Sequence, residues 1–121
     1  MVTNDISVCE RMIMKIIWDS QEAPALQQIM DRVNEENGKN WKSQTVSTFL
    51  SRLVKKGFLT SQRRGRYSYY QPLVSKEEFW QATMEENAEF FAQGDMVEMA
   101  YRLCRKMLSR EEREKLKEKL E

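Results

Sequence analysis

The order of the secondary-structure patterns constrains the fold of this chain more than any other feature of the sequence. Three amphipathic helical patterns are followed by two short stretches of partly alternating, β-favouring residues, 58–62 and 67–71. The tetrapeptide Arg63-Arg64-Gly65-Arg66 joins the two stretches, and a glycine in so short a connection favours a hairpin turn. We therefore predict a mainly α fold with a small β-hairpin.

Each N-terminal helical pattern carries one apolar stripe. The patterns cover about 7–20, 24–37 and 43–56, and Gly38 and Gly57 stand where left-handed residues commonly end helices. The stripe residues recur at helical spacing: Val8, Met12, Ile13, Ile16 and Ile17, then Leu26, Ile29, Met30 and Val33, then Val46, Phe49, Leu50 and Leu53. These stripes predict three helices whose apolar faces point inward.

The chain beyond Pro72 is also predicted to be helical. Serine followed three residues later by glutamate is typical of a helix start, and it occurs as Ser7 with Glu10, Ser75 with Glu78, and Ser109 with Glu112. The tripeptide 93–95 should separate one helix from another that runs over about 96–108. The apolar side chains exceed what these short helices can hide on themselves, so we predict a homodimer that covers Phe79, Trp80, Phe91, Met96, Val97, Ala100, Leu103 and Met107.

Positive charge is concentrated in one continuous third of the chain. Residues 37–76 contain no aspartate or glutamate, whereas the region before Pro72 as a whole has 11 basic and 7 acidic residues and the region after it has 9 and 12. The cations of the acid-free window are Lys39, Lys42, Arg52, Lys55, Lys56, Arg63, Arg64, Arg66 and Lys76. Such a local positive field is typical of a polyanion-binding surface, and nucleic acid is the commonest polyanion partner. Lys39 and Lys76, at its edges, are predicted to be ordinary solvated charges.

The charge and the element order together predict a winged helix-turn-helix that binds double-stranded DNA. In that fold the third helix enters the major groove. Its predicted outward residues are Gln44, Thr45, Ser47, Thr48, Ser51, Arg52 and Lys55. Glutamine can pair with adenine and arginine with guanine, and the turn arginines (Arg63, Arg64 and Arg66) suit DNA backbone or a minor groove. We predict a winged-helix domain over 1–73 and a helical dimerisation region over 74–121.

The sequence argues against an enzyme. It contains no histidine, which is the commonest general base, and it has no glycine-rich phosphate loop. Cys9 and Cys104 are isolated from one another, so we predict no metal site, no cofactor and no disulfide. With no signal peptide and no apolar run of membrane-spanning length, the expected location is the cytoplasm, without membrane insertion.

The segment from Trp41 to Leu59, WKSQTVSTFLSRLVKKGFL, resembles the penicillinase repressor family, the BlaI/MecI/CopY group. The Tyr69-Tyr70 pair, the early helix 10–18 and the stretch Leu108-Ser109-Arg110-Glu111-Glu112 are also similar. The resemblance implies a dimeric transcriptional repressor on operator DNA, with contacts from Lys42, Gln44, Thr45, Ser47, Thr48 and Arg52. The complete set of predicted DNA-contacting residues is Lys42, Ser43, Gln44, Thr45, Ser47, Thr48, Arg52, Lys55, Arg63, Arg64 and Arg66.

Two signatures of the family's switches are missing. Its β-lactam-responsive members are cleaved at an Asn-Phe bond, but Tyr101-Arg102 stands at the matching place. Its copper-responsive members carry a C-terminal cysteine cluster, and this chain ends Lys119-Leu120-Glu121. The inducing signal therefore stays open, with a membrane sensor protease as a candidate further partner. Two other functions also stay open: an RNA-binding winged helix, which a narrow A-form major groove disfavours, and a winged helix that binds an acidic protein.

Overall fold

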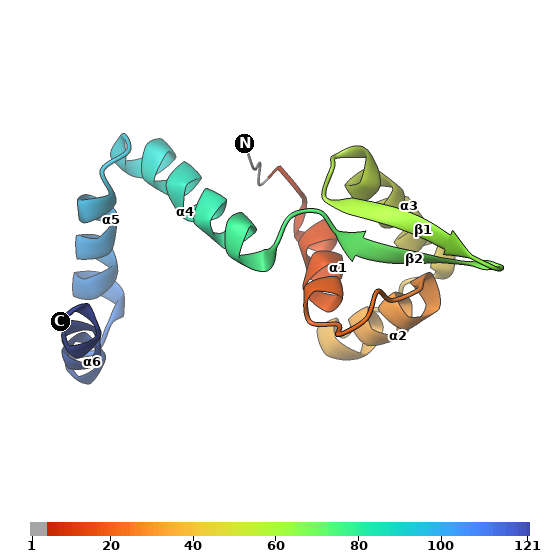
Figure 1. The fold of residues 1–121 in the computed structure, drawn as a ribbon. Helices are drawn as coiled ribbons and strands as arrows, with labels where there is room; N and C mark the ends of the chain where they lie inside the picture. The colour runs from red at the N-terminus through yellow and green to blue at the C-terminus, as the bar shows by residue number, and fades with distance from the viewer. Residues whose placement is uncertain (1–4) are drawn as a thin grey trace. The chain divides into compact units, whose positions relative to one another are not determined.

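Three helices followed by an antiparallel hairpin form the N-terminal part of the computed structural model, which describes residues 5–121 (Figure 1). The chain divides into two units, Met1–Trp80 and Gln81–Glu121, which we treat separately. The elements of the first unit are α1 (Val8–Trp18), α2 (Leu26–Asn37), α3 (Ser43–Lys55), β1 (Leu59–Arg64) and β2 (Tyr67–Pro72). The predicted fold class, mainly helical with one hairpin, is confirmed.

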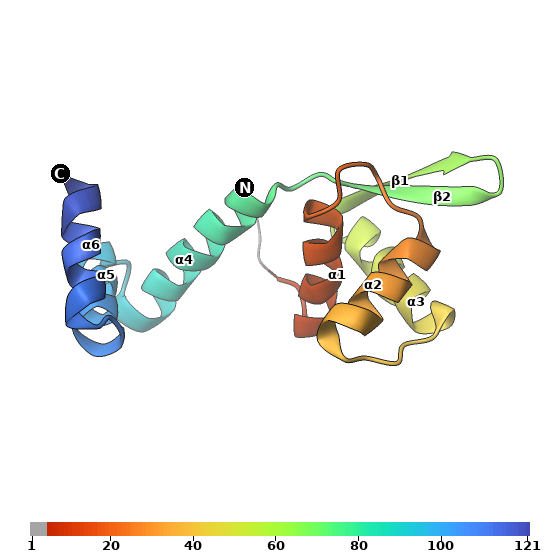
Figure 2. The ribbon, with the colours of Figure 1, turned by 90° about the horizontal axis from the view of Figure 1, so that it is seen from below.

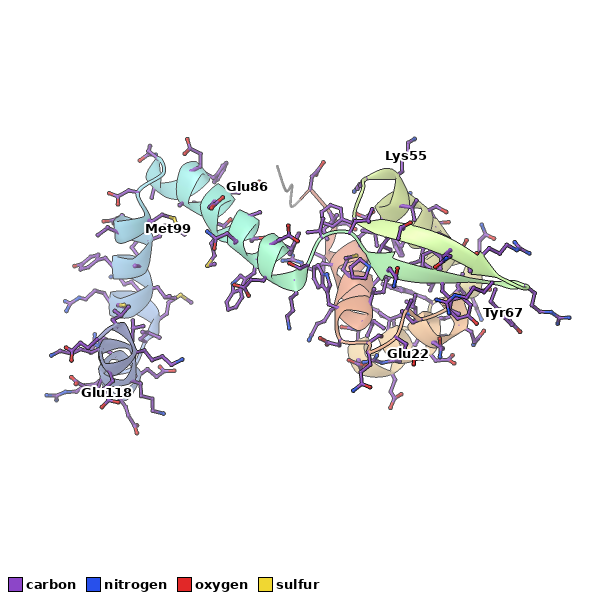
Figure 3. The ribbon with its side chains drawn as sticks, viewed as in Figure 1. Glu22, Lys55, Tyr67, Glu86, Met99 and Glu118 are labelled. Atoms are coloured by element: carbon purple, nitrogen blue, oxygen red, sulfur yellow. The ribbon has the colours of Figure 1, made fainter. Side chains whose placement is uncertain are left out.

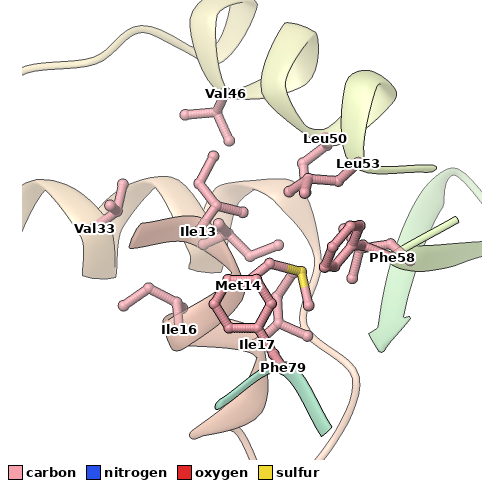
Figure 4. Packing of buried hydrophobic residues seen from close by; sticks show 12 residues of the cluster. Ile13, Met14, Ile16, Ile17, Val33, Val46, Leu50, Leu53, Phe58 and Phe79 are labelled. Carbon is pink, nitrogen blue, oxygen red and sulfur yellow. The ribbon is translucent and has the colours of Figure 1, made fainter. Parts of the chain in front are cut away.

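The core of the N-terminal unit lies between α1, α2 and α3 and is closed by the start of the hairpin (Figures 2 and 4). Its fully or almost fully buried residues are Ile13, Met14, Ile16, Ile17, Ile29, Val33, Val46, Leu50, Leu53, Phe58 and Leu59, joined by Phe79. Most of these residues belong to the predicted stripes. Val8 is an exception, because it is the first residue of α1 and stays exposed, and Met14 is buried although the sequence pattern did not include it.

The second helix begins two residues later than predicted. Pro24 was expected at its start, but the Pro24 carbonyl accepts a hydrogen bond from the Tyr70 amide at 3.0 Å, and Ala25 forms an isolated antiparallel bridge with Tyr69. The backbone at Ala25 is consequently extended, and α2 starts at Leu26. This short pairing attaches the α1–α2 connection to the hairpin.

The hairpin is longer than predicted and its turn is tighter. Its register runs from Leu59 opposite Pro72 to Arg64 opposite Tyr67, so Arg63 and Arg64 belong to β1 and the loop is only Gly65-Arg66. Gly65 has φ 65°, which a two-residue turn of this kind requires and which glycine adopts without steric cost. Only Leu59 of β1 is buried, so the rest of the strand projects beyond the core.

A buried carboxylate joins the start of α1 to the end of α3. Lys56 Nζ donates to Glu10 Oε1 at 2.9 Å, and the Glu10 side chain is 2% exposed while that of Lys56 is 36% exposed. Glu10 also completes the predicted capping box with Ser7. Burial acts to raise the pKa of Glu10, but the hydrogen bonds from Ser7 and Lys56 outweigh it, and the pKa lies below its usual 4.5.

We expect Lys56→Met to lower the free energy of unfolding by about 2–3 kcal/mol at neutral pH, because it leaves the Glu10 charge buried without its cation. Glu10→Gln should cost less, since the partly exposed Lys56 can turn to water. Because the pKa of Glu10 is depressed, its stabilisation is present above pH 4.5 and is lost as the pH falls. Urea unfolding from pH 7 to pH 3 should therefore show the free energies of unfolding of the wild type and Lys56→Met converging. Equal losses for Lys56→Met and Glu10→Gln at pH 7 would contradict this account.

The second unit is entirely helical apart from its connections. It contains most of α4 (Lys76–Ala92), then α5 (Met96–Arg102), the π-helical turn η1 (Leu103–Met107) and α6 (Arg110–Leu120). Both predicted C-terminal capping boxes are present, and the break at 93–95 is confirmed by positive φ values at Gln93 and Gly94. The helix predicted over 96–108 is α-helical only to Arg102. Among residues 5–121, none of the helices combines the length and apolar character of a membrane span.

Candidate nucleic-acid interface

One side of α3 faces the core and the opposite side presents polar residues to solvent. Val46, Leu50 and Leu53 are buried. The predicted contact residues Gln44, Thr48, Arg52 and Lys55 are exposed at helical spacing, while Thr45 and Ser47 are half-buried at the margins (Figure 3 labels Lys55). This arrangement provides a continuous polar strip along α3, which we call the exposed side of α3.

Two features of this strip bear on its chemistry. The Thr48 hydroxyl donates to the Gln44 carbonyl at 3.0 Å, so its proton is used inside the helix although the residue is exposed. Lys42 occupies the N-cap position without a side-chain hydrogen bond to the helix, and the first turn has no acidic residue. The positive end of the helix dipole at Ser43 is thus reinforced by the Lys42 charge, which favours an anion there.

The turn arginines gather at the far end of the hairpin. All three are exposed. The Arg64 guanidinium lies 4.9 Å from the centre of the Tyr69 ring, and Arg63 Nε donates to the Gly65 carbonyl at 3.2 Å. Within the described residues, no hydrogen bond or ring contact joins the turn arginines to α3. The contact between Arg64 and the Tyr69 ring was not predicted from the sequence; it follows from the register, which pairs Arg64 with Tyr67 and puts Tyr69 at the diagonal position.

The hairpin nevertheless flanks the C-terminal half of α3. A shallow groove between them is lined by Ser51, Val54 and Lys55 of α3 and by Ser61 and Tyr70 of the hairpin. The structure therefore brings Lys55 next to the hairpin, whereas Lys42 and Ser43 stand at the opposite end of α3. Two aromatic side chains near this surface pack instead of facing solvent: the Trp41 ring lies 5.1 Å from that of Phe49, and Tyr70 contacts the core.

The cations of the exposed side of α3 and of the turn are not neutralised. Across the part of the chain that the structure describes, no carboxylate lies within 4.0 Å of Lys42, Arg52, Lys55, Arg63, Arg64 or Arg66. By contrast Lys56 is paired with Glu10, and Lys76 lies 4.0 Å from Asp19. The six unpaired cations form a positive surface, which we call the basic surface.

The apolar residues predicted to dimerise differ in their surroundings. Phe79 is 8% exposed and packs its ring 5.5 Å from Trp18 and 6.0 Å from Phe58, so it belongs to the core of the N-terminal unit. This placement corrects the grouping made from sequence, because the apolar surface of Phe79 is already covered within the chain. The other seven are exposed and form what we call the apolar set: Trp80, Phe91, Met96, Val97, Ala100, Leu103 and Met107.

No group of three or more potential metal ligands occurs among residues 5–121. The two cysteines, Cys9 and Cys104, are both half-buried and form no disulfide.

Three helices, a hairpin and a basic surface that covers the third helix and the turn define a winged-helix protein. The family model described as penicillinase repressor matches residues 6–121, so this chain belongs to the penicillinase repressor family. It is 32% identical over 76 residues to the methicillin resistance regulatory protein MecI of Staphylococcus aureus strain N315 and 30% identical over 74 residues to the penicillinase repressor of Bacillus licheniformis. These alignments cover 63% and 61% of this chain, but 59% and 56% of the relatives.

Two solved structures resemble the N-terminal part of the chain. The solution structure of the DNA-binding domain of the repressor BlaI matches with a TM-score of 0.54 and 28% identity, over 64% of this chain and 93% of that one. The monomeric form of Bacillus licheniformis BlaI in complex with the blaP half-operator matches with a TM-score of 0.50 and 28% identity, over 61% and 87%. These likenesses support the winged-helix fold derived above.

Proposed function

We propose that this chain is a transcriptional repressor that binds double-stranded operator DNA in a sequence-specific manner, as a dimer on an inverted repeat. The observation that carries the proposal is the basic surface, whose six cations have no carboxylate partner. Unpaired cations crowded on one surface repel one another and contribute little to folding, but each can neutralise a phosphate and release its counterion. The likeness to a BlaI structure in complex with a half-operator supports the same reading of this surface.

The exposed side of α3 is proposed to enter the major groove. Gln44 offers the amide pattern that pairs with adenine, Arg52 can bind guanine or phosphate, and the Thr48 methyl can contact thymine. The Lys42 end of the helix suits a phosphate. At the hairpin turn, the arginines are proposed to hold the backbone or the minor groove, which supplies affinity without reading base edges in the same detail.

The apolar set is proposed to pair two chains. The division predicted from the sequence is a DNA-binding domain over 1–73 and a dimerisation region over 74–121; Phe79 of the latter packs in the core of the N-terminal unit, so only the apolar set is proposed to pair the chains. A dimer holds its second half-site at a high effective concentration, so a change that loosens the C-terminal helices would lower operator occupancy far more than it lowers the affinity of one protomer. Occupancy of an operator by such a dimer would block transcription.

A selection from random duplex DNA tests the proposal. The full chain should enrich an inverted repeat whose half-sites are separated by about one helical turn, near 10 base pairs, or a multiple of it. The segment upstream of the chain's own gene is a natural second probe. Enrichment of sequences without two-fold symmetry would contradict the dimeric mode, and preferential retention of an RNA duplex of the same sequence would favour the RNA-binding alternative.

Substitutions should separate the residues that give sequence preference from those that give only affinity for DNA. We expect Gln44→Ala to lower the preference for the selected duplex over a scrambled one by about 1–3 kcal/mol, because it removes a base contact. Arg63→Ala should weaken binding to both duplexes to a similar extent, since phosphate contacts carry no direct sequence information. Titrations of each variant against both duplexes measure the two quantities. An unchanged preference in Gln44→Ala would show that Gln44 does not contact a base edge.

Release of the operator requires either a weaker dimer or a cut in the C-terminal helices. Loosening of the dimer is our preferred mode of release, and a membrane sensor protease stays an alternative. Tyr101, at the place of the family's cleavage bond, is exposed in the last turn of α5, two residues before η1. The mass of the chain released on induction distinguishes an intact repressor from one cut within residues 96–107.

A further inference from the structure

Asn34 fastens both ends of the connection between α2 and α3. Its carbonyl accepts hydrogen bonds from the amides of Gly38 and Lys39, the second at 3.1 Å. Its side chain takes both polar backbone groups of Trp41: Oδ1 accepts from the Trp41 N–H at 2.9 Å, and Nδ2 donates to the Trp41 carbonyl at 3.1 Å. One residue of α2 thus makes four hydrogen bonds to the segment that leads into α3.

Trp41 connects the hydrogen bonds of Asn34 to the start of α3. It directly precedes Lys42, and its ring packs 5.1 Å from that of Phe49, which contacts the core from within α3. The Lys42 side chain makes no capping hydrogen bond, so no side chain at the N-cap position fixes the start of α3. The Asn34–Trp41 hydrogen bonds and the Trp41–Phe49 contact therefore hold the chain just before Lys42, while the buried Val46 anchors the first turn of α3 from the core side.

We propose that Asn34 is a positioning residue for DNA recognition, acting through Trp41 on the first turn of α3; this inference rests on the proposed function. Hydrogen bonds to base edges tolerate only a few tenths of an ångström and weaken steeply when misaligned. Attraction to phosphates is much less directional. Loss of the Asn34–Trp41 hydrogen bonds should consequently reduce discrimination between DNA sequences while leaving non-specific DNA binding almost unchanged.

Asn34→Ala in the full chain tests the inference, with Asn37→Ala as the matched control. Asn37 is the same residue type on the same helix, but its Nδ2 donates at 3.3 Å to the Val33 carbonyl within α2. Dissociation constants for a duplex enriched by the wild-type chain and for its scrambled version should be measured where both variants are fully folded. We expect the ratio of the two constants to fall about tenfold for Asn34→Ala and to stay unchanged for Asn37→Ala.

Amide hydrogen exchange gives a second readout that needs no DNA. The Trp41 amide should exchange faster in Asn34→Ala and as in the wild type in Asn37→Ala. If Asn34→Ala does not fold, the isosteric Asn34→Asp can replace it, because it also lacks the Nδ2 donor. Its added charge weakens binding to both duplexes alike and cancels in the ratio of the two constants. A fall in that ratio therefore still reports the lost hydrogen bond to Trp41.

The outcomes separate this inference from the function on which it rests. A wild-type chain that selects no DNA sequence would overturn the proposed function and the inference together. A selective wild-type chain whose Asn34 variants keep the full ratio would overturn the inference alone, even if those variants were less stable, because a purely structural residue lowers stability without changing discrimination.

Discussion

Raising the salt concentration from about 50 to 200 mM should weaken the binding of one protomer to duplex DNA by roughly a thousandfold. Each neutralised phosphate contributes a slope of about −0.9 to the plot of log affinity against log salt, so contacts from the six cations of the basic surface give a slope of about −5. The absence of carboxylates within 4.0 Å of these cations, among the residues described, means that little of the charge is compensated before DNA arrives.

Two lysines offer a matched comparison within this measurement. Lys55 is exposed on α3 beside the hairpin, while Lys76 lies at the start of α4, 60% exposed and 4.0 Å from Asp19. Lys55→Gln should make the slope shallower by about 0.9 per bound protomer, and Lys76→Gln should leave it unchanged. Equal effects of the two changes would mean that net charge, not the basic surface, attracts DNA. A slope near zero for the wild-type chain would remove the electrostatic premise altogether.

Local signals made most of the helices predictable. The capping boxes at Ser7, Ser75 and Ser109 each join a side chain to a backbone group three residues away, so none of the three depends on distant structure. The apolar stripes of α1, α2 and α3 recur at the helical period. The start of α2 was displaced because the Pro24 carbonyl pairs with Tyr70, a contact across the fold that no local pattern contains.

The candidate site was predictable to the extent that it depends on charge and helical spacing. The acid-free window and the period of α3 pointed to Arg52, Lys55 and the turn arginines, all of which are exposed and have no carboxylate within 4.0 Å among the described residues. What sequence could not supply was pairing at long range. Lys56 lies in the same window, but Glu10, 46 residues earlier, takes its charge out of the basic surface.

Phe79 and Phe91 lie on the same helix and should give opposite results when each is changed to alanine. The Phe79 ring is 8% exposed between Trp18 and Phe58, and the Trp18 indole also donates to the Val74 carbonyl at 2.8 Å. Removal of a buried phenylalanine leaves a cavity, so we expect Phe79→Ala to lower the free energy of unfolding by about 3–5 kcal/mol. Urea unfolding followed by tryptophan fluorescence measures this loss.

Phe91→Ala should change self-association instead. Its ring is 69% exposed within one chain and has only the exposed Phe90 ring, at 4.7 Å, as an aromatic neighbour among the described residues. Because a two-fold dimer buries the residue twice, we expect the dimer dissociation constant to rise about tenfold or more. Sedimentation equilibrium of the full chain gives this constant. The same experiment on Phe79→Ala reports whether that change leaves the dimer dissociation constant unaltered.

The pair of variants decides how the two functions are divided along α4. If its first turn completes the DNA-binding domain, Phe79→Ala weakens DNA binding only by reducing the folded fraction, and conditions that restore folding restore binding. If its later turns hold the dimer, Phe91→Ala leaves a folded chain that binds a half-site normally and the full inverted repeat poorly. A Phe91→Ala chain that stays dimeric at micromolar concentration and binds the repeat with wild-type affinity would place the dimer contact elsewhere in the apolar set.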